Sequence, residues 1–237
     1  MKHGKKYRSA LKKAPQKPVS IEEAVKFVKA NAGAKFDETV DVYFHLGKEL
    51  TKGDTAVRGT VKLPNGSGKN VKVCVFAGGD AAEAAKAAGA DFVGMADLIE
   101  KITKEGWCDF DVAIATVEAM KEGRQCARVL GPRGLMPNPK TGTVTDDTAT
   151  AVKEAKGGKV DFRMDRTGNL CVVAGKRSFE DAALVANIKA VVAAVNGAKP
   201  ATVKGVFIKS MSISSTMGVG VPVIATADAE YSGGKLK

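Results

Sequence analysis

Apolar and polar positions in the first third of the chain predict one helix and two strands. After Ser20, apolar residues recur at helical spacing from Ile21 to Val28, and Ser20 with the two glutamates that follow is typical of a helix start. Residues 40–46 and 57–63 contain runs that are typical of half-buried strands. The second strand ends at breakers in 64–68, where the pattern changes.

The middle of the chain repeats a strand and helix alternation. Val/Ile-rich runs at 71–76 and 111–116 are separated by an Ala-rich segment and by a helical stretch at 96–103. Short strands that alternate with helices indicate βαβ units around a parallel sheet. Residues 128–144, dense in proline and glycine, predict an extended, turn-rich surface loop.

The last third predicts a hairpin, a long helix and a strand with two distinct faces. Residues 159–164 and 169–173 are expected to pair around a turn at 165–168, and residues 179–195 to form a helix. In the strand over 206–214, Phe207, Met211 and Ile213 fall on one side and are interrupted by Lys209. Alternation places four hydroxyl groups on the other side: Ser210, Ser212, Ser214 and Thr216.

Charge is distributed unevenly along the 237 residues. The formal net charge is +11, which favours an anionic partner, nucleic acid before a membrane surface. Residues 67–158 hold 12 basic and 13 acidic side chains, so the whole excess lies outside them. We therefore interpret the middle as a near-neutral domain inserted into a basic domain built from both chain ends. Two consecutive domains with a basic N-terminal tail are the alternative.

Composition and spacing exclude most catalytic and metal chemistry. Two histidines and four scattered cysteines without a CxxC pair supply no typical metal site, and the cysteines are expected to be buried and reduced. Glycine-rich segments near 63–70 and 77–80 lack the spacing of phosphate-binding loops. We predict no cofactor, no metal and no catalytic residue. Without an apolar signal or membrane span, a soluble intracellular protein is expected.

The hydroxyl row is the strongest binding signal. Hydroxyl groups can bind phosphate, ribose 2′-OH groups and base edges, although a solvated sheet face is equally rich in Ser and Thr. Met217 and Gly218, which follow Thr216, favour the RNA interpretation because they permit stacking and close backbone approach. Phe36, which precedes a strand, is either a core anchor or a stacking surface.

Motifs along nearly the whole chain resemble the family of large-subunit ribosomal protein one, the L-one family. The most specific is RVLGPRGLMPNPKTGTV at 128–144. The others are KHGKKYR at 2–8, KFDETVDV at 35–42, VRGTVKLPNGSGK at 57–69, AGADFVG at 88–94, GWCDFDVAIAT at 106–116 and STMG at 215–218. The family commonly has His in place of Asn65 and Pro in place of Val219.

The resemblance implies a two-domain α/β protein. Residues 1–66 plus 159–237 would form a discontinuous α+β domain that binds RNA, and residues 67–158 an inserted Rossmann-like α/β domain. The two crossings between them would act as hinges, at Pro64, Gly66 and Gly68 and at Gly157 and Gly158.

The function that the resemblance implies is structural and non-enzymatic. Members bind the stalk helices of large-subunit rRNA, contact exit-site tRNA and assist its movement and release, and in bacteria repress translation of their own operon mRNA. A cytoplasmic, ribosome-associated protein that is monomeric when free and has no membrane partner is expected. The alternatives are a stand-alone mRNA-binding repressor and a phosphate-substrate enzyme that uses the middle domain.

Matching family motifs residue by residue extends the hydroxyl row to a full set of expected RNA contacts. In the basic domain these are Lys35, Phe36, Thr39, Arg163, Asp165, Arg166, Ser210, Ser212, Ser214, Thr216, Met217 and Gly218. Arg133 and Lys140 in the inserted domain are expected to make secondary RNA contacts.

Overall fold

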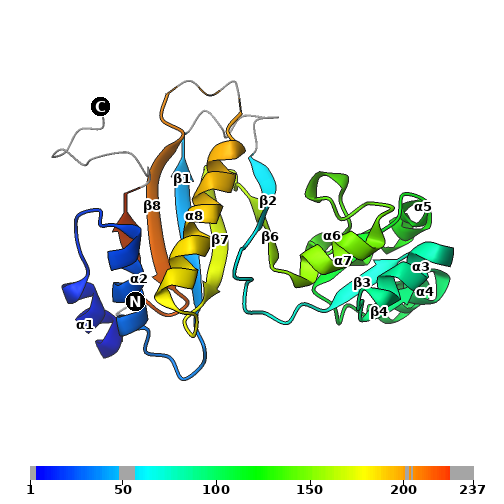
Figure 1. Ribbon diagram of the computed structural model, residues 1–237, viewed down its shortest axis with the longest axis horizontal. Coiled ribbons are helices and arrows are strands. Elements are labelled where there is room, and N and C mark those ends of the chain that lie inside the picture. Colours follow the sequence, from blue (N-terminus) through cyan, green and yellow to red (C-terminus); the bar gives the residue numbers. More distant parts are fainter. Residues whose placement is uncertain (1–3, 48–56, 201–202, 204, 225–237) are drawn as a thin grey trace. The chain divides into compact units, whose positions relative to one another are not determined.

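The chain divides into two compact units in the computed structural model, which describes residues 4–47, 57–200, 203 and 205–224 (Figure 1). Unit 1 comprises Met1–Gly68 and Val160–Lys237, and unit 2 comprises Lys69–Lys159. These bounds lie close to the predicted domain boundaries. That each unit folds as an independent domain stays a prediction.

Unit 1 is an antiparallel sheet with helices on one face. Its strands follow the order β7-β1-β8-β9, and β2 pairs with β6 in a separate two-stranded sheet. The elements are α1 (Lys5–Lys13), α2 (Ile21–Asn31), β1 (Thr39–Leu46), β2 (Arg58–Lys62), β6 (Lys159–Arg163, whose first residue belongs to unit 2), β7 (Asn169–Lys176), α8 (Asp181–Gly197), β8 (Ile208–Ser215) and β9 (Val221–Val223).

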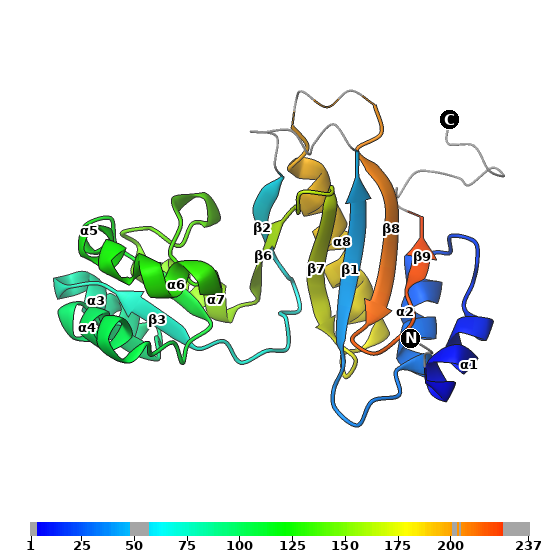
Figure 2. The same ribbon diagram turned by 180° about the vertical axis from the view of Figure 1, so that it is seen from behind.

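The core of unit 1 follows from the alternation in β1. Val40, Val42, Phe44 and Leu46 are buried against α2 and α8, whereas the residues between them face the other side of the sheet. Figures 1 and 2 show the helices on one side only; in Figure 2 the strands are seen with no described helix in front of them. One face of the sheet is therefore packed and the other is open.

Unit 2 is a small parallel sheet between two helical layers. Its strand order is β4-β3-β5. Alternation along β3 sends Val73 and Val75 into a cluster with α3 and α7, and Cys74 and Phe76 into a cluster with α4 and α6. This arrangement confirms the predicted α/β fold. The elements are β3 (Val73–Phe76), α3 (Gly79–Ala87), β4 (Phe92–Gly94), α4 (Ala96–Glu105), β5 (Val112–Ala115), α5 (Ala119–Gly123), η3 (Arg124–Cys126), α6 (Ala127–Arg133), η4 (Pro139–Thr141) and α7 (Thr148–Lys156).

The predicted hairpin between 159–164 and 169–173 is wrong. A tight turn does form, because the Asp165 carboxylate accepts the backbone N–H groups of Thr167 and Asn169. The strands on either side then enter different sheets, β6 beside β2 and β7 beside β1. Long-range pairing therefore overrides the local hairpin pattern.

Two further segments differ from the sequence prediction. The proline- and glycine-rich run predicted as an extended loop begins within helix α6, which contains Pro132. The helix ends soon after Pro132 in a left-handed cap at Gly134 (φ 71°), whose N–H donates to the carbonyl oxygens of Leu130 and Gly131, and the Leu130 side chain is buried. The basic N-terminal tail forms helix α1 over its described residues.

Asn187 is a fully buried polar residue that ties the first crossing to unit 1. From helix α8, its Nδ2 donates to the carbonyl oxygens of Gly66 (3.0 Å) and Ala174 (2.7 Å). Its Oδ1 accepts the backbone N–H of Asn65 at 3.1 Å. One side chain thus pairs three backbone groups that would otherwise be unsatisfied or solvent-dependent.

We expect Asn187→Ala to destabilise unit 1 by about 2–4 kcal/mol, because it leaves buried backbone groups unpaired. Urea unfolding followed by far-UV circular dichroism would show an earlier transition. The fluorescence of Trp107, which lies in unit 2, should keep its midpoint. Asn196→Ala, at an exposed position of the same helix, is the matched control. A midpoint unchanged in both signals would contradict the assignment.

Candidate nucleic-acid interface

The open face of the unit 1 sheet brings polar side chains from three strands into rows. The register places Ser214 beside Asp41, Ser212 beside Tyr43 and Ser210 beside His45. On the other side of β1, Val173, Cys171 and Asn169 continue the same three rows. We call these nine residues the outer face. Its centre is Tyr43, whose 42% exposure makes it the large apolar surface of the open side.

A β-bulge explains why Lys209 interrupts the predicted alternation. His45 pairs with Ser210 and Leu46 with Ile208, so Lys209 has no partner opposite it on β1. Phe207 and Ile208 are consequently both buried, while Lys209 and Ser210 are both exposed. The bulge therefore adds a cation to the outer face beside the hydroxyl row.

A hollow of about 480 Å³ lies where the outer face meets the turn after β6. Arg163 and Asp165 line it together with Ser210, Ser212 and His45. The His45 ring contacts Asn169 Oδ1 at 2.9 Å through Nδ1. The structure thus brings Arg163 and Asp165, predicted from the resemblance, next to the hydroxyl row predicted from alternation.

The Asp165 carboxylate is occupied by its own turn. It accepts from the backbone N–H groups of Asn169 (2.7 Å) and Thr167 (2.9 Å) and from the Thr167 hydroxyl (2.8 Å). These hydrogen bonds, that of Asn169 first, lower the pKa of Asp165. The carboxylate shapes the turn that presents the exposed Arg166, which gives Asp165 a positioning role.

Two exposed apolar side chains mark the opposite end of β1 and β8. Phe36 precedes β1 and is 55% exposed, and Met217 follows β8 and is 66% exposed. Both line one groove, together with Gly218. We call residues 34–38 and 215–219 the loop edge. The exposure of Phe36 favours the stacking surface over the core anchor.

A buried carboxylate organises the loop edge. Glu38 is fully buried, and its two oxygens accept the backbone N–H groups of Ala34 (2.8 Å) and Met217 (3.1 Å). Burial alone would raise the pKa of Glu38, but the Ser215 hydroxyl, these two N–H groups and the Arg177 charge together lower it. The ionised side chain therefore holds the two loops against each other.

Thr216 and Thr39 form a second link between the same loops. The Thr216 hydroxyl accepts the Thr39 N–H at 3.0 Å and lies 3.3 Å from the Thr39 carbonyl oxygen, to which it donates. The Thr39 hydroxyl in turn accepts from Lys176 Nζ at 2.9 Å. Both predicted RNA-contact residues thus have structural partners that the strand pattern could not reveal.

Gly218 is required by close packing on Ser215. A Cβ added at Gly218 would lie 2.3 Å from the Ser215 hydroxyl oxygen, closer than side chains tolerate. That oxygen is buried beside Glu38 without a hydrogen bond of good geometry among the described residues. A side chain at 218 would therefore force either the Ser215 hydroxyl or the Met217 loop to shift.

The expected contacts in unit 1 therefore fall along one strip. Lys35, Phe36, Thr216, Met217 and Gly218 belong to the loop edge, and Thr39 is the first residue of β1 beside it. Arg163, Asp165 and Arg166 lie at the far end of the outer face. The three serines join the ends over a strand of eight residues, about 25 Å long. Sequence reasoning missed Glu38, Tyr43 and Lys209 as members of this strip; the polar alternation of β1 was the available signal for Tyr43.

The two residues expected to make secondary contacts lie in unit 2. Arg133 is the exposed last residue of α6, and Lys140 lies in the short helix η4. Both residues lie within the run at 128–144, which carries the most specific family motif. These two residues do not belong to the strip, because all members of the strip lie in unit 1.

The first predicted hinge is anchored at both ends. On the unit 1 side, Asn65 and Gly66 bond to Asn187, and Gly68 packs so closely on Lys176 and Phe179 that a Cβ would come within 2.9 Å. The predicted hinge residues Pro64, Gly66 and Gly68 therefore belong to a turn held on unit 1.

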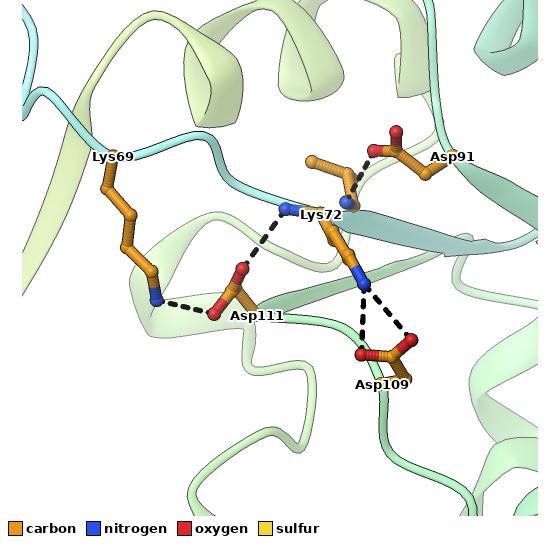
Figure 3. A network of polar contacts seen from close by, with 6 residues as sticks. Lys69, Lys72, Asp91, Asp109 and Asp111 are labelled. Atoms are coloured by element: carbon orange, nitrogen blue, oxygen red, sulfur yellow. Dashed lines mark hydrogen bonds and ion pairs between the residues drawn. The ribbon is translucent and has the colours of Figure 1, made fainter.

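Figure 3 shows the anchor on the unit 2 side of this crossing. Asp111 accepts from Lys69 Nζ (2.5 Å) and from the Lys72 backbone N–H (3.1 Å), and Asp109 pairs with Lys72 Nζ (3.0 Å). Lys69, then the Lys72 groups, lower the pKa of Asp111 against its partial burial. The contacts on the unit 1 side therefore reach Gly68, and those on the unit 2 side begin at Lys69.

The second crossing is a glycine pair at the end of α7. Gly157 caps the helix by donating to Lys153 O at 2.8 Å. Gly158 has φ 93°, a left-handed conformation that side chains disfavour. The pair therefore allows the chain to leave the helix and enter β6 within two residues.

The described residues show neither a metal site nor a membrane-spanning helix. They contain no group of three or more His, Cys, Asp or Glu that could hold a metal, and no described helix is long and apolar enough to cross a membrane. Cys74 and Cys126 are buried as predicted, but Cys171 is exposed on the outer face. The expectation of buried cysteines is wrong there because β7 turns that position away from the core.

Comparisons with known proteins place this chain in one family. The ribosomal protein L1p/L10e family matches residues 28–219. A large ribosomal subunit protein uL1 of Ralstonia pickettii is 56% identical over 203 residues, 86% of this chain and 87% of the relative. The uL1 protein of Streptococcus pneumoniae is 52% identical over 223 residues, 94% and 97% of the two chains.

The uL1 protein of Burkholderia lata is 53% identical over 214 residues, 90% of this chain and 92% of the relative. All three relatives are named as ribosomal proteins, which confirms the prediction of a non-enzymatic protein and removes the phosphate-substrate enzyme as an alternative. The match covers both units and every expected RNA contact. The chain therefore belongs to the ribosomal protein L1p/L10e family.

Proposed function

We propose that this chain is a structural protein of the large ribosomal subunit that binds the stalk helices of large-subunit rRNA through the strip on unit 1. The observation that carries the proposal is the uncovered outer face, where a hydroxyl row runs between the exposed Phe36 and Met217 and the arginines at the far end. Membership of a ribosomal protein family and the positive charge of the outer segments support it.

The strip suits RNA because its cations, hydroxyl groups and apolar side chains match the phosphates, riboses and bases of RNA. Arg163, Arg166 and Lys35 supply phosphate affinity that weakens with salt. Serine hydroxyls can both donate to and accept from ribose 2′-OH groups in the wide, shallow minor groove of an RNA helix. Phe36 and Met217 offer apolar contact to bases or sugars at the loop edge.

Further parts of the proposal rest on the family resemblance. Exit-site tRNA and the mRNA of the protein's own operon would be additional partners, the latter through an rRNA-like site that lets the protein repress its translation. Gly68–Lys69 and Gly157–Gly158 would act as hinges that let unit 2 follow the tRNA, with Arg133 and Lys140 as secondary contacts. The protein would be monomeric when free and cytoplasmic when ribosome-bound.

We expect Met217→Ala to weaken binding to a stalk rRNA fragment by about 5- to 30-fold, since one apolar contact to a base is worth roughly 1–2 kcal/mol. A gel shift across a salt series measures it. The slope against salt should stay that of the wild type, because no charge is removed. Thr216→Val is a poorer probe, because it also breaks the link to Thr39.

Val117→Ala is the control for Met217→Ala: Val117 is an apolar residue of similar exposure in unit 2. Equal affinity of all three proteins for the stalk fragment would contradict the placement of the RNA.

Sucrose-gradient sedimentation tests the remaining alternative, a stand-alone mRNA repressor, because such a repressor would not sediment with large ribosomal subunits.

We expect Glu38→Gln to destabilise unit 1 by about 1–3 kcal/mol at neutral pH, since an amide cannot accept both N–H groups. The pKa of Glu38 is lowered in the folded protein, so its stabilisation is present above the usual value of 4.5 and is lost as pH falls through the folded pKa. Urea midpoints for wild type and variant should therefore converge in acid.

Glu83→Gln, which changes an exposed carboxylate in unit 2, controls for the general loss of charge. It should leave the unit 1 transition in place at every pH. A gap between wild type and Glu38→Gln that does not narrow below pH 4.5 would show that the carboxylate charge is not what holds the loops.

A further inference from the structure

Helix α1 and the loop edge enclose a groove, and the proposed RNA strip supplies one of its two walls. Lys6, Tyr7 and Ala10 form one wall, and Phe36 and Met217 lie among the residues of the other. The groove has a volume of about 440 Å³, within the range of roughly 300–1,000 Å³ typical of small-molecule sites. It is thus a concave site beside two exposed apolar side chains.

The wall made by α1 is held lightly and is strongly basic. No residue of α1 is buried, although Tyr7 and Ala10 are half-buried on the groove side. The Lys6 stem passes Gly33, where an added Cβ would lie 3.9 Å from Lys6 Cδ. The remaining cations of the helix are exposed around it: Lys5, Arg8, Lys12 and Lys13.

The charge and shape of the groove lining favour one class of ligand. Among the residues that the structure describes, Lys6 is the charged residue of the groove wall, and no carboxylate lines the groove. A basic peptide would therefore find no counter-charge, whereas a polyanion would meet the cations of α1. The aromatic and thioether side chains favour a flat, polarisable ring, such as a nucleobase.

We propose that this groove takes one unpaired nucleobase of the bound RNA, stacked between Tyr7 on α1 and the Phe36–Met217 side of the loop edge. The inference rests on the proposed RNA binding and adds a specific element to it. A paired base cannot present its faces, so the occupant must come from a bulge, loop or end. Lys6 Nζ would meet a phosphate next to that base.

The test blocks the groove and removes bases one at a time. Ala10→Trp fills the groove, and Leu11→Trp places the same ring at an exposed neighbouring position outside the lining. Because α1 has no buried residue, both variants should keep the wild-type circular dichroism spectrum. The probes are a stalk rRNA fragment and copies in which each unpaired nucleotide in turn is abasic.

We expect Ala10→Trp to bind the intact fragment about tenfold more weakly and Leu11→Trp within about twofold of wild type, in line with the energy of one stacked base. One abasic position should weaken wild type by a similar factor and leave Ala10→Trp unaffected, because the two changes remove the same contact. Lys6→Ala should weaken binding more than Lys5→Ala.

The outcomes separate this inference from the proposed function. Failure of the wild type to bind the intact fragment would overturn the proposed function itself. Binding of the intact fragment with no abasic position coupled to Ala10→Trp would overturn only base insertion, as would equal losses for Ala10→Trp and Leu11→Trp. Coupling at a single unpaired nucleotide supports the groove as its site.

Discussion

The pairing of β1 between two late strands is the constraint on which the rest of the structure depends. Val40 lies opposite Gly175 of β7 on one side and Ser215 of β8 on the other, so the first part of the chain is incomplete until the last part arrives. The middle segment must consequently leave and return as an insertion. The same pairing aligns serines of β8 with polar residues of β1, which creates the outer face. Fold and candidate interface are thus products of one register.

Period-two alternation could be predicted from the sequence because burial of one sheet face dictates it residue by residue. It correctly gave the core side of β1 and the serine side of β8. The α/β character of unit 2 followed instead from short apolar strands that alternate with helices. Features set by distant partners could not be predicted in this way. The separation of β6 from β7 depends on β2, and the Lys209 bulge depends on the register with His45 and Leu46. Glu38 gives no local signal, since its N–H donors include one from residue 217.

Helix α1, in contrast, was detectable from local spacing. Tyr7, Ala10, Leu11 and Ala14 recur at helical spacing, but the density of lysines concealed this pattern.

The two units differ in how far their charged side chains pair with one another. Five of the six ion pairs found among the described residues lie within unit 2, including Lys69–Asp111 and Lys156–Asp91. Such pairs are largely exposed and contribute little stability each, but they neutralise the unit's own field. In unit 1 the pair Lys29–Asp181 joins α2 to α8 on the helical side of the sheet. Arg166 and Lys209 are exposed near the outer face, so their charges face solvent.

The buried carboxylate of Glu38 lies below the loop edge that we propose as part of the RNA interface. The negative charge of Glu38 accepts two backbone N–H groups and lies near Arg177, so little of it reaches solvent. What it provides is order: residues 34 and 217 come from loops that no strand pairing fixes, and one side chain holds both. Loops that are ordered before binding lose less entropy when they bind. Phe36 and Met217 can therefore remain exposed in the free protein and still contribute to RNA affinity, because Glu38, and not the bound RNA, orders the loops that carry them. In the proposed interface, the two hydrogen bonds of Glu38 thus contribute both to the stability of the loop edge and to its affinity for RNA.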